Sequence, residues 1–365
     1  MCVMQALVGQ NVKTKENAVD NNKSVKIGLL ISDEKAEAAL YGAEIAISEA
    51  NENGGFYNKP FQLVVRSMEG PWGTGSKQAV NLIFDEEVWA IMGSHDGRNA
   101  HLVEQVTTKA HIVFLSAWAT DPTLSQAFTP WYFSCVPNDN QQADMLIEEA
   151  FVKRKLSRVA VISENGYDSK QSLNSFLKKT KISGFSDPLK LVYDNTEQNC
   201  SALLDQISKA NVNCVILFGL PSSSLKLVQQ IQQKGMNLNL FGTLSLLDEK
   251  ELSDQDLKRY EGVVMLTSGH WLSTRGSGFI EEFQTTYGLM PGAVAAYAYD
   301  GMNIIIEAIK NAGLNRDSIQ KSMAGIKYEG VTGLIQFDNK GNRINAGQLM
   351  EIKNGHPEIH MCIAP

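Results

Sequence analysis

Three loops of the sequence gather polar and aromatic side chains directly after short apolar runs. Residues 93–99 (GSHDGRN) follow the run VWAIM, and residues 116–122 (SAWATDP) follow the run IVFL. Residues 164–168 (ENGYD) follow a third run, RVAVIS. Loops that combine charged, hydroxyl and aromatic groups are suited to holding a small ligand by a few hydrogen bonds between apolar walls.

The side chains of these loops indicate which groups of a ligand they would contact. Arg98 is suited to an anionic group and Asp96 to a cationic one. Trp118 and Tyr167, together with Trp72 from residues 70–77, can supply apolar walls with a polar edge. We therefore take these five residues as candidate ligand-binding residues.

Motifs of common enzyme classes are absent from the sequence or incomplete. Residues 70–77 (GPWGTGSK) come close to a phosphate-binding loop, but in such a loop the lysine directly follows the last glycine. The sequence contains no GxGxxG, HExxH or GxSxG motif, and its six histidines lack metal-ligand spacing. We expect a protein that is not an enzyme and that needs neither a metal nor a cofactor.

The elements that position the three loops alternate along the chain as apolar strands and amphipathic helices. One series runs from the strand at residues 25–31 to the strand at 112–115, and a second runs from 158–162 to 262–267. Continuous apolar strands are typical of parallel sheets covered on both faces. The pattern predicts an α/β protein of two lobes, in which the loops lie at the carboxyl ends of the strands, where ligands bind in such folds.

Composition limits the classes of protein and of partner. The chain has 365 residues, enough for two domains, and 43 % of them are hydrophobic. The formal net charge of −7 argues against a nucleic-acid partner. No apolar run is long enough for a membrane span. Five scattered cysteines without a CxxC motif predict small buried side chains rather than a disulfide framework.

The first 23 residues differ in composition from the rest of the chain. Residues 10–24 (QNVKTKENAVDNNKS) are polar and aperiodic, so we expect residues 1–23 to be a flexible leader. A full signal peptide is not visible. Cys2 precedes this leader and has two interpretations, a lipid-anchored cysteine or a start-site artefact.

Several short segments occur in an order and spacing that are typical of one protein family. They are VKIG at 25–28, YGA at 41–43, ANENGG at 50–55, KQAV at 77–80, SAWATDPTL at 116–124 and AYAYD at 296–300. Over about residues 24–355 the chain resembles the type I periplasmic solute-binding proteins, especially their leucine/isoleucine/valine-binding branch.

The resemblance implies two Rossmann-like lobes with parallel central sheets, joined by a hinge of three crossovers. Lobe one would comprise residues 24–135 and 268–332, and lobe two residues 136–267 and 333–361. Members of the family close around a small molecule and deliver it to the permease of an ABC importer. We therefore expect a periplasmic or other extracytoplasmic monomer whose partners are a small ligand and a permease.

The resemblance also assigns roles to individual residues. Thr120 and the loop before it, including Ala119, would hold a ligand carboxylate, and the carbonyl of Trp118 would accept from an ammonium group. Tyr167 would close over the ligand from lobe two. The family's second carboxylate ligand, a serine, falls at Gly97, where only a backbone N–H group or the neighbouring Arg98 can replace it.

One departure from the family concerns the ligand's ammonium group. The acidic residue that pairs with this group in amino-acid binders falls at Leu244, and an unpaired buried ammonium costs several kcal/mol. Asp96, Asp121 and Asp300 are candidate replacements. Two ligand classes stay open, an amino acid or an aromatic or aliphatic carboxylate without an amine.

Three functions are compared at this point. The first is a solute-binding protein of an ABC importer. The second is a sensor module of the same fold that signals to a receptor partner. The third, a Rossmann-type enzyme, is disfavoured by the missing GxGxxG motif.

Overall fold

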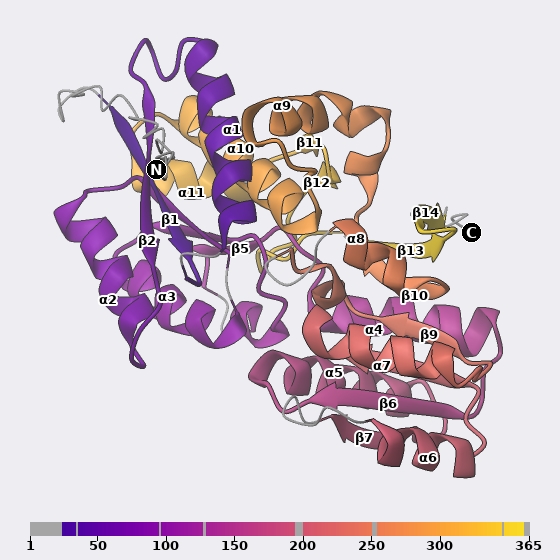
Figure 1. The fold of residues 1–365 in the computed structure, drawn as a ribbon. Coiled ribbons are helices and arrows are strands. Elements are labelled where there is room, and N and C mark those ends of the chain that lie inside the picture. Colours follow the sequence, from indigo (N-terminus) through magenta and orange to yellow (C-terminus); the bar gives the residue numbers. More distant parts are fainter. Residues whose placement is uncertain are drawn as a thin grey trace, which may run out of the picture.

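Two sheets form the centres of two lobes in the computed structural model (Figure 1). The structure describes residues 24–33, 36–94, 96–126, 129–193, 200–249, 254–344 and 347–360. Residues 1–23, with Cys2 and the expected leader, lie outside the described residues, as does His95. The strand order is β2-β1-β3-β4-β5 in the first sheet and β14-β13-β10-β9-β8-β6-β7 in the second.

The first sheet is parallel and buried on both faces. Consecutive residues of a strand point to opposite faces, so Leu29 packs into one apolar core and Leu30 into another. Helices α1 and α10 cover the first of these faces, and α2 and α3 cover the second. The elements are β1 (Val25–Ile31), β2 (Phe61–Ser67), β3 (Ala90–Ser94), β4 (Val113–Ser116), β5 (Tyr132–Ser134), α1 (Glu37–Glu52), α2 (Thr74–Val80), α3 (Gly97–Lys109) and α10 (Ala293–Ala312).

The second sheet repeats this arrangement and adds an antiparallel edge. Ile162 and Val161 of one strand face different cores, lined by α6 and α7 on one side and by α4 and α5 on the other. Strand β13 pairs antiparallel with both β10 and β14. The elements are β6 (Val159–Glu164), β7 (Leu189–Tyr193), β8 (Cys214–Phe218), β9 (Asn239–Gly242), β10 (Val263–Thr267), β13 (Gln348–Lys353), β14 (His356–His360), α4 (Asp139–Ile147), α5 (Tyr167–Ile182), α6 (Ser201–Lys209) and α7 (Pro221–Gln233).

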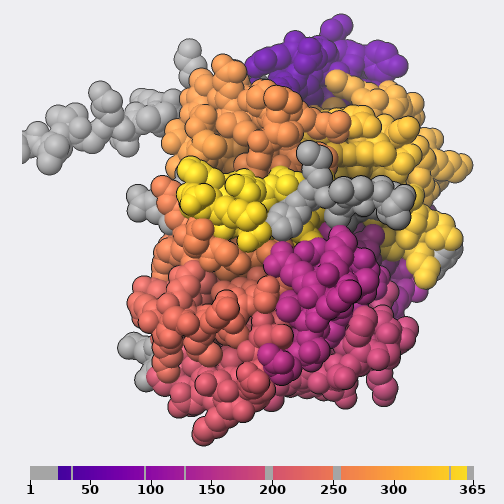
Figure 2. Space-filling view, turned by 90° about the vertical axis from the view of Figure 1, so that its right-hand side faces the viewer, coloured from indigo at the N-terminus to yellow at the C-terminus, as the bar shows by residue number. Residues whose placement is uncertain are grey.

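The chain passes between the two sheets three times, which confirms the predicted two-lobed α/β class. It leaves the first sheet after β5, leaves the second after β10, and returns to the second at β13. In Figure 2 the yellow C-terminal strands lie across the middle of the face shown, between the two halves. The remaining elements are α8 (Asp254–Leu257), α9 (Ser277–Tyr287), α11 (Arg316–Ala324) and the hairpin of β11 (Tyr328–Gly330) and β12 (Gly333–Ile335).

Local differences from the predicted elements have physical reasons. Helices α2 and α4 each continue into a π-helical turn, at Asn81–Asp85 and Glu148–Lys153. Strand β14 was not predicted, because its sequence, HPEIH, lacks the apolar run of a central strand, but an edge strand tolerates both proline and charge.

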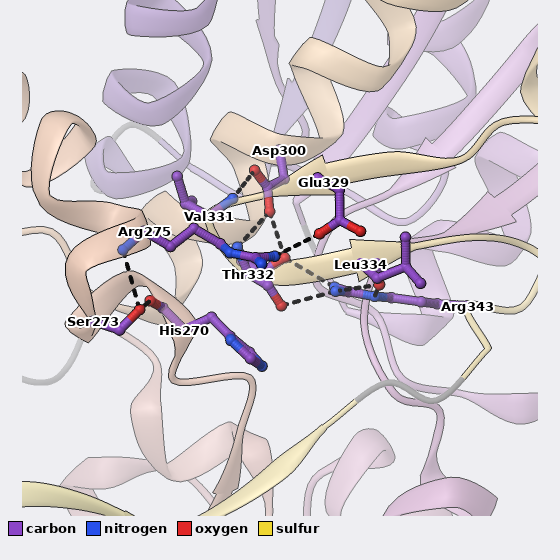
Figure 3. Close-up of polar contacts among 9 residues, drawn as sticks. All are labelled: His270, Ser273, Arg275, Asp300, Glu329, Val331, Thr332, Leu334 and Arg343. Carbon is purple, nitrogen blue, oxygen red and sulfur yellow. Dashed lines mark hydrogen bonds and ion pairs between the residues drawn. The ribbon is translucent and has the colours of Figure 1, made fainter.

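A buried arginine ties the crossovers together (Figure 3). Arg343 is 2 % exposed, and all five of its N–H groups have acceptors. It donates to the Cys135 carbonyl (3.0 Å) in the first crossover and to the carbonyls of Thr332 (2.8 Å) and Leu334 (3.0 Å) in the third. The Thr332 hydroxyl accepts from Arg343 (2.9 Å) and donates to Asp300. One hydroxyl thus links a buried cation to a buried carboxylate.

Other features of the described residues concern the cysteines and the membrane. Cys135 and Cys214 are buried free thiols and Cys200 is also buried, while Cys362 lies outside the described residues. Within the described part of the chain, no helix is both long and apolar enough to cross a membrane.

Arg343→Met should destabilise the protein strongly. The substitution removes the guanidinium but leaves Asp300 and three carbonyl groups buried, and such a change costs about 3–5 kcal/mol. Urea unfolding followed by circular dichroism measures the change. Arg275→Met is the control, because Arg275 makes an exposed ion pair with Glu329 (2.7 Å) worth less than about 1 kcal/mol. Equal effects of the two substitutions would contradict the structural role of Arg343.

Candidate ligand-binding cleft

Loops from the carboxyl ends of strands in both lobes contact each other. The N–H group of Gly97, in the first lobe, donates to Oδ1 of Asp168 in α5 of the second lobe (3.0 Å). The hydroxyl of Tyr167, also in α5, donates to Oδ2 of Asp121 in the first lobe (2.9 Å). The loops that the sequence singled out therefore face one another across the two lobes.

Asp121 is the centre of the first group of contacts. Asp121 is 3 % exposed, and its side chain accepts from Thr123 N–H (2.8 Å), the Thr123 hydroxyl (2.6 Å) and Tyr167. Nε2 of His101 lies 3.2 Å from Oδ2. Burial raises the pKa of Asp121, but these hydrogen bonds outweigh burial and hold the pKa well below its ordinary value. The hydrogen bond that His101 makes to the Asp121 carboxylate in turn raises the pKa of His101.

The beginning of α3 explains why a glycine stands at position 97. Asp96 caps the helix, accepting from the Asn99 backbone N–H (2.9 Å) and side chain (2.8 Å). A Cβ atom at Gly97 would lie 2.7 Å from Cβ of Asp121 and 2.9 Å from Oδ1 of Asp168, so only glycine allows this approach. Burial raises the pKa of Asp168 to about 6, and the nearby Asp96 carboxylate contributes to the rise.

Arg98 forms the outer rim of this group. Its guanidinium carbon lies 5.4 Å from the ring centroids of both Trp72 and Tyr167, a cation–π arrangement. Arg98 is exposed, and Trp72 is 68 % exposed. The structure thus brings together three of the candidate ligand-binding residues, because Arg98 lies between the rings of Trp72 and Tyr167 at the entrance.

The loop after β4 lies deeper. Ala119 is buried, and its N–H group donates to the Ser116 hydroxyl (3.1 Å), which fixes the turn. The carbonyl of Thr120 accepts from the N–H group of Asp139 (2.8 Å) at the start of α4. Trp118 packs edge-on against Tyr297 of α10, with ring centroids 6.4 Å apart. This loop therefore lies against both the first crossover and the main helix of lobe one.

Asp139 is a residue of this region that the sequence analysis missed. It is 2 % exposed, and its Oδ1 accepts from the Ser172 hydroxyl (2.9 Å). Its Oδ2 is buried without a hydrogen-bond partner. Burial raises the pKa of Asp139 to about 8, although the hydroxyls of Thr120 and Ser172 act in the opposite direction. The sequence feature that could have indicated Asp139 is an acidic residue at the first position of a helix directly after a crossover.

Glu249 makes a second contact between the lobes, which was also not predicted. It follows β9 and accepts from the N–H groups of Gly292 (2.7 Å), Val294 and Ala295 (3.3 Å) at the beginning of α10. A helix N-terminus is a favourable place for a carboxylate. Burial nevertheless raises the pKa of Glu249 to about 8.

Leu244 and Asp300 do not provide a free polar group to the facing loops. Leu244 is fully buried, and its N–H group donates to Oε1 of Gln142 (3.0 Å). Asp300 was expected as a replacement carboxylate for a ligand ammonium, but it is fully buried in the crossover network. It accepts there from the N–H groups of Val331 (2.9 Å) and Thr332 (2.7 Å). The expectation for Asp300 is corrected accordingly, because both of its oxygens already have donors.

Among the described residues, no group of three or more His, Cys, Asp or Glu side chains is arranged to hold a metal ion. The facing loops offer backbone N–H groups, hydroxyls, aromatic rings and carboxylates. Such groups can bind and orient a small polar molecule.

Comparison with known proteins identifies similar sequences. The sequence profile of the periplasmic binding proteins matches residues 24–357. The Leu/Ile/Val-binding protein homolog 1 of Brucella abortus is 22 % identical over 316 residues, which cover 85 % of this chain and 83 % of the relative. Glutamate receptor 3.7 of Arabidopsis thaliana is 27 % identical over 76 % of this chain, but the match spans only 31 % of the receptor.

Solved structures show the same fold. The branched-chain amino acid binding protein LivJ of Streptococcus pneumoniae, solved with isoleucine, has a TM-score of 0.81 at 20 % identity and covers 93 % of this chain and 99 % of its own. An ABC transporter solute-binding protein of R. palustris, solved with benzoate, has a TM-score of 0.79 at 16 % identity, covering 92 % and 95 %.

The raised pKa of Asp139 predicts a pH dependence of stability. Between its ordinary pKa and about 8 the carboxyl is charged in the unfolded chain but neutral in the fold. Its stabilising contribution is therefore complete below about pH 4 and is lost as pH rises towards 8. In urea unfolding at pH 5 to 8, Asp139→Asn should flatten the fall of the unfolding free energy, by at most about 1.4 kcal/mol per pH unit.

Asp144→Asn on the same helix is the matched control, because Asp144 is exposed and pairs with Lys179 (2.7 Å). Parallel curves for the wild type and Asp139→Asn would show that Asp139 is not held neutral by the fold.

Proposed function

We propose, because the chain belongs to the periplasmic binding protein family, that it captures a small organic acid between its lobes and delivers it to an ABC importer. The family binds solutes and does not convert them, so the chain is not an enzyme. The lobe boundaries at residues 135/136, 267/268 and 332/333 are part of this proposal, since the lobes must move as units around the crossovers.

The observation that carries the proposal is the pair of contacts between the facing loops. Tyr167 and Asp168 of one lobe bond to Asp121 and Gly97 of the other (2.9 and 3.0 Å). A ligand enclosed by these loops stabilises closure in proportion to its preference for the closed state. The hydrogen bonds between the lobes and the contacts of a bound ligand would therefore stabilise the closed state together.

The groups that would hold the ligand are the hydroxyl of Thr120, the carbonyl of Trp118 and the N–H groups at the start of α3. A ligand carboxylate at that helix must compete with Asp168, whose Oδ1 occupies the Gly97 N–H group. Arg98 offers an alternative anion partner at the entrance. If the ligand carboxylate displaced Asp168 from the Gly97 N–H group, a contact between the lobes would be replaced by a contact with the ligand.

The relatives indicate two ligand classes. LivJ was solved with isoleucine and the R. palustris protein with benzoate. Both ligands are small carboxylates with an apolar body, and only isoleucine carries an ammonium group. We therefore assign the shared chemistry, a small carboxylate with an apolar part, to the ligand of this chain.

A sensor function is the second candidate, and the similarity to plant glutamate receptors favours it. The chain spans about a third of the length of these receptors, so the similarity concerns only that part of each receptor. In both cases we place the protein outside the cytoplasm. Reconstitution with a candidate permease distinguishes the two functions, because an importer component stimulates ATP hydrolysis by its permease complex.

A thermal-shift panel tests the proposed ligand class. We expect one or more free amino acids or amine-free carboxylates to raise the melting temperature by several degrees. A ligand at 100 times its dissociation constant contributes about 2.7 kcal/mol, enough for a shift of this size. The panel contains aliphatic and aromatic members of both classes. No shift with any compound would contradict the proposal.

Thr120→Ala and Tyr167→Ala should each weaken binding of the compound that the panel identifies. Each substitution removes one hydrogen-bonding group, so we expect about a tenfold loss or more, with the fold retained. Isothermal titration calorimetry measures the dissociation constants. Thr286→Ala and Tyr57→Ala, both at exposed positions, are the matched controls. Unchanged affinity in both cleft variants would show that the ligand binds elsewhere.

A further inference from the structure

Positive charge is concentrated in one segment of lobe two. Residues 150–192 contain nine lysines and arginines but only three acidic residues, whereas the whole chain has a formal net charge of −7. Two of these three, Glu164 and Asp168, lie at the end of β6 and the beginning of α5, beside the facing loops. Away from those loops the charge of the segment is therefore almost entirely positive.

The topology of lobe two brings these basic residues to one end of the lobe. Helices α4 and α5 run parallel, because Asp139 bonds to Ser172 (2.9 Å) and, further along both helices, Asp144 bonds to Lys179 (2.7 Å). The carboxyl ends of these helices and the amino ends of β6 and β7 therefore lie at the end of the lobe opposite the facing loops. In Figure 2 this end faces the viewer in the lower half, where the magenta and pink segments lie together.

Packing contacts join the basic stretches into a single surface. The ring of Phe151, in the π-helical turn after α4, stacks on the ring of Phe185 after α5, with centroids 4.7 Å apart. In the sheet, Lys190 of β7 is paired in register with Val161 of β6, and Val161 packs into the core on the side of α4 and α5. Paired residues of parallel strands point to the same face of a sheet. Three stretches thus belong to one surface, namely residues 152–155, 178–182 and 190.

Four lysines of this surface have no charged partner. Lys155, Lys178, Lys181 and Lys190 are exposed, and in the part of the chain that the structure describes no ion pair or side-chain hydrogen bond joins any of them to another residue. We call these four lysines, together with Ile182, the basic surface. Its ammonium groups are available to a partner outside the chain.

The stability of the fold accounts for only part of this charge. A cation in the last turn of a helix is favoured by the helix dipole, which explains Lys181 at the end of α5. A lysine on an edge strand, such as Lys190 of β7, opposes pairing with another sheet. Lys178 precedes the last turn of α5, and Lys155 lies beyond the π-helical turn, so neither reason applies to them. Like charges on one surface repel each other, and an anionic partner would relieve this repulsion.

Exposed aliphatic side chains accompany these lysines. Ile182 at the end of α5 is 71 % exposed, and Val152 in the π-helical turn is 47 % exposed. Val192, which points to the same side of β7 as Lys190, is 58 % exposed. Lysines beside aliphatic groups suit the interface of a lipid bilayer, where the aliphatic groups enter among the headgroups and the ammonium groups stay in water. Single-stranded nucleic acids are bound instead by stacked aromatic rings, whereas these exposed apolar side chains are aliphatic.

We propose that the basic surface binds the anionic surface of a phospholipid bilayer. Each of its lysines is attracted to anionic headgroups, and Ile182 adds an apolar contact in the interfacial region. The facing loops lie at the opposite ends of β6 and α5, so contact with a bilayer leaves them accessible to a ligand. The chain is thereby held at a membrane surface through lobe two, and this binding does not depend on the proposed ligand.

Co-sedimentation of the full chain with vesicles tests the proposal. The vesicles consist of phosphatidylcholine alone or of phosphatidylcholine with about one third phosphatidylglycerol. We expect the partition coefficient to be about tenfold or more higher for the anionic vesicles at low salt. Raising the salt to about 1 M, where the Debye length is about 3 Å, should remove most of this difference.

Two variants locate the binding on the basic surface. The triple variant Lys155→Gln/Lys178→Gln/Lys181→Gln should lower partition to the anionic vesicles about tenfold or more, because it removes three attractive charges. Ile182→Ser should lower it several-fold and leave the salt dependence unchanged. The matched control has the same change of net charge on lobe one, with glutamine at three exposed positions, Lys59, Lys321 and Lys327. The control should bind the vesicles like the wild type, and circular dichroism checks that all variants are folded.

Three results would overturn the proposal. The first is equal partition of the wild type to neutral and anionic vesicles, and the second is an equal loss of binding in the two triple variants. The third is binding of a DNA duplex as tightly as of anionic vesicles, with no effect of Ile182→Ser on either, which would make the surface a general site for polyanions. Each of these results leaves the proposed capture of a small carboxylate untouched, because the thermal-shift panel measures that capture separately.

Discussion

The buried chain of hydrogen bonds from Arg343 through Thr332 to Asp300 is the constraint on which the arrangement of the lobes depends. The guanidinium holds carbonyl groups of the first and third crossovers, and the carboxylate of α10 holds the backbone of Val331 and Thr332. Because each of these groups is satisfied only in this arrangement, the crossovers are fixed relative to α10.

Together with the direction of the strands, this constraint determines which loops of the two lobes face each other. Parallel strands direct their carboxyl ends, with the helices that follow them, towards the region between the lobes. The crossovers then bring α3 and α5 together, so that a helix N-terminus in one lobe meets carboxylates of the other. Glu249 makes a comparable contact with α10. Internal carboxylates thus occupy places that suit an anionic ligand.

Much of the fold could be predicted from the sequence, because its signals are local. The strand predicted at residues 25–31 corresponds to β1 without any shift, and the strand predicted at residues 262–267 corresponds to β10 with a shift of one residue at its start. The edge strand β14 could not be predicted, because its pairing with β13 depends on a neighbour rather than on its own sequence.

Of the candidate site, only residues with a local sequence pattern could be predicted. Tyr167 and Gly97 lie in loops with an evident local pattern, and the structure brings them to the same region. Asp300 was misassigned, since its burial depends on Thr332, distant in sequence. Asp139 was missed because its unpartnered oxygen is a property of three-dimensional packing. Residues whose role depends on contacts between lobes were thus the ones beyond the reach of sequence patterns.

The most direct test of the account is a crystal structure of the chain with the compound that stabilises it most. We predict a small carboxylate enclosed between the lobes, in contact with Thr120 and Tyr167. A ligand bound outside the region between α3 and α5 would contradict the account.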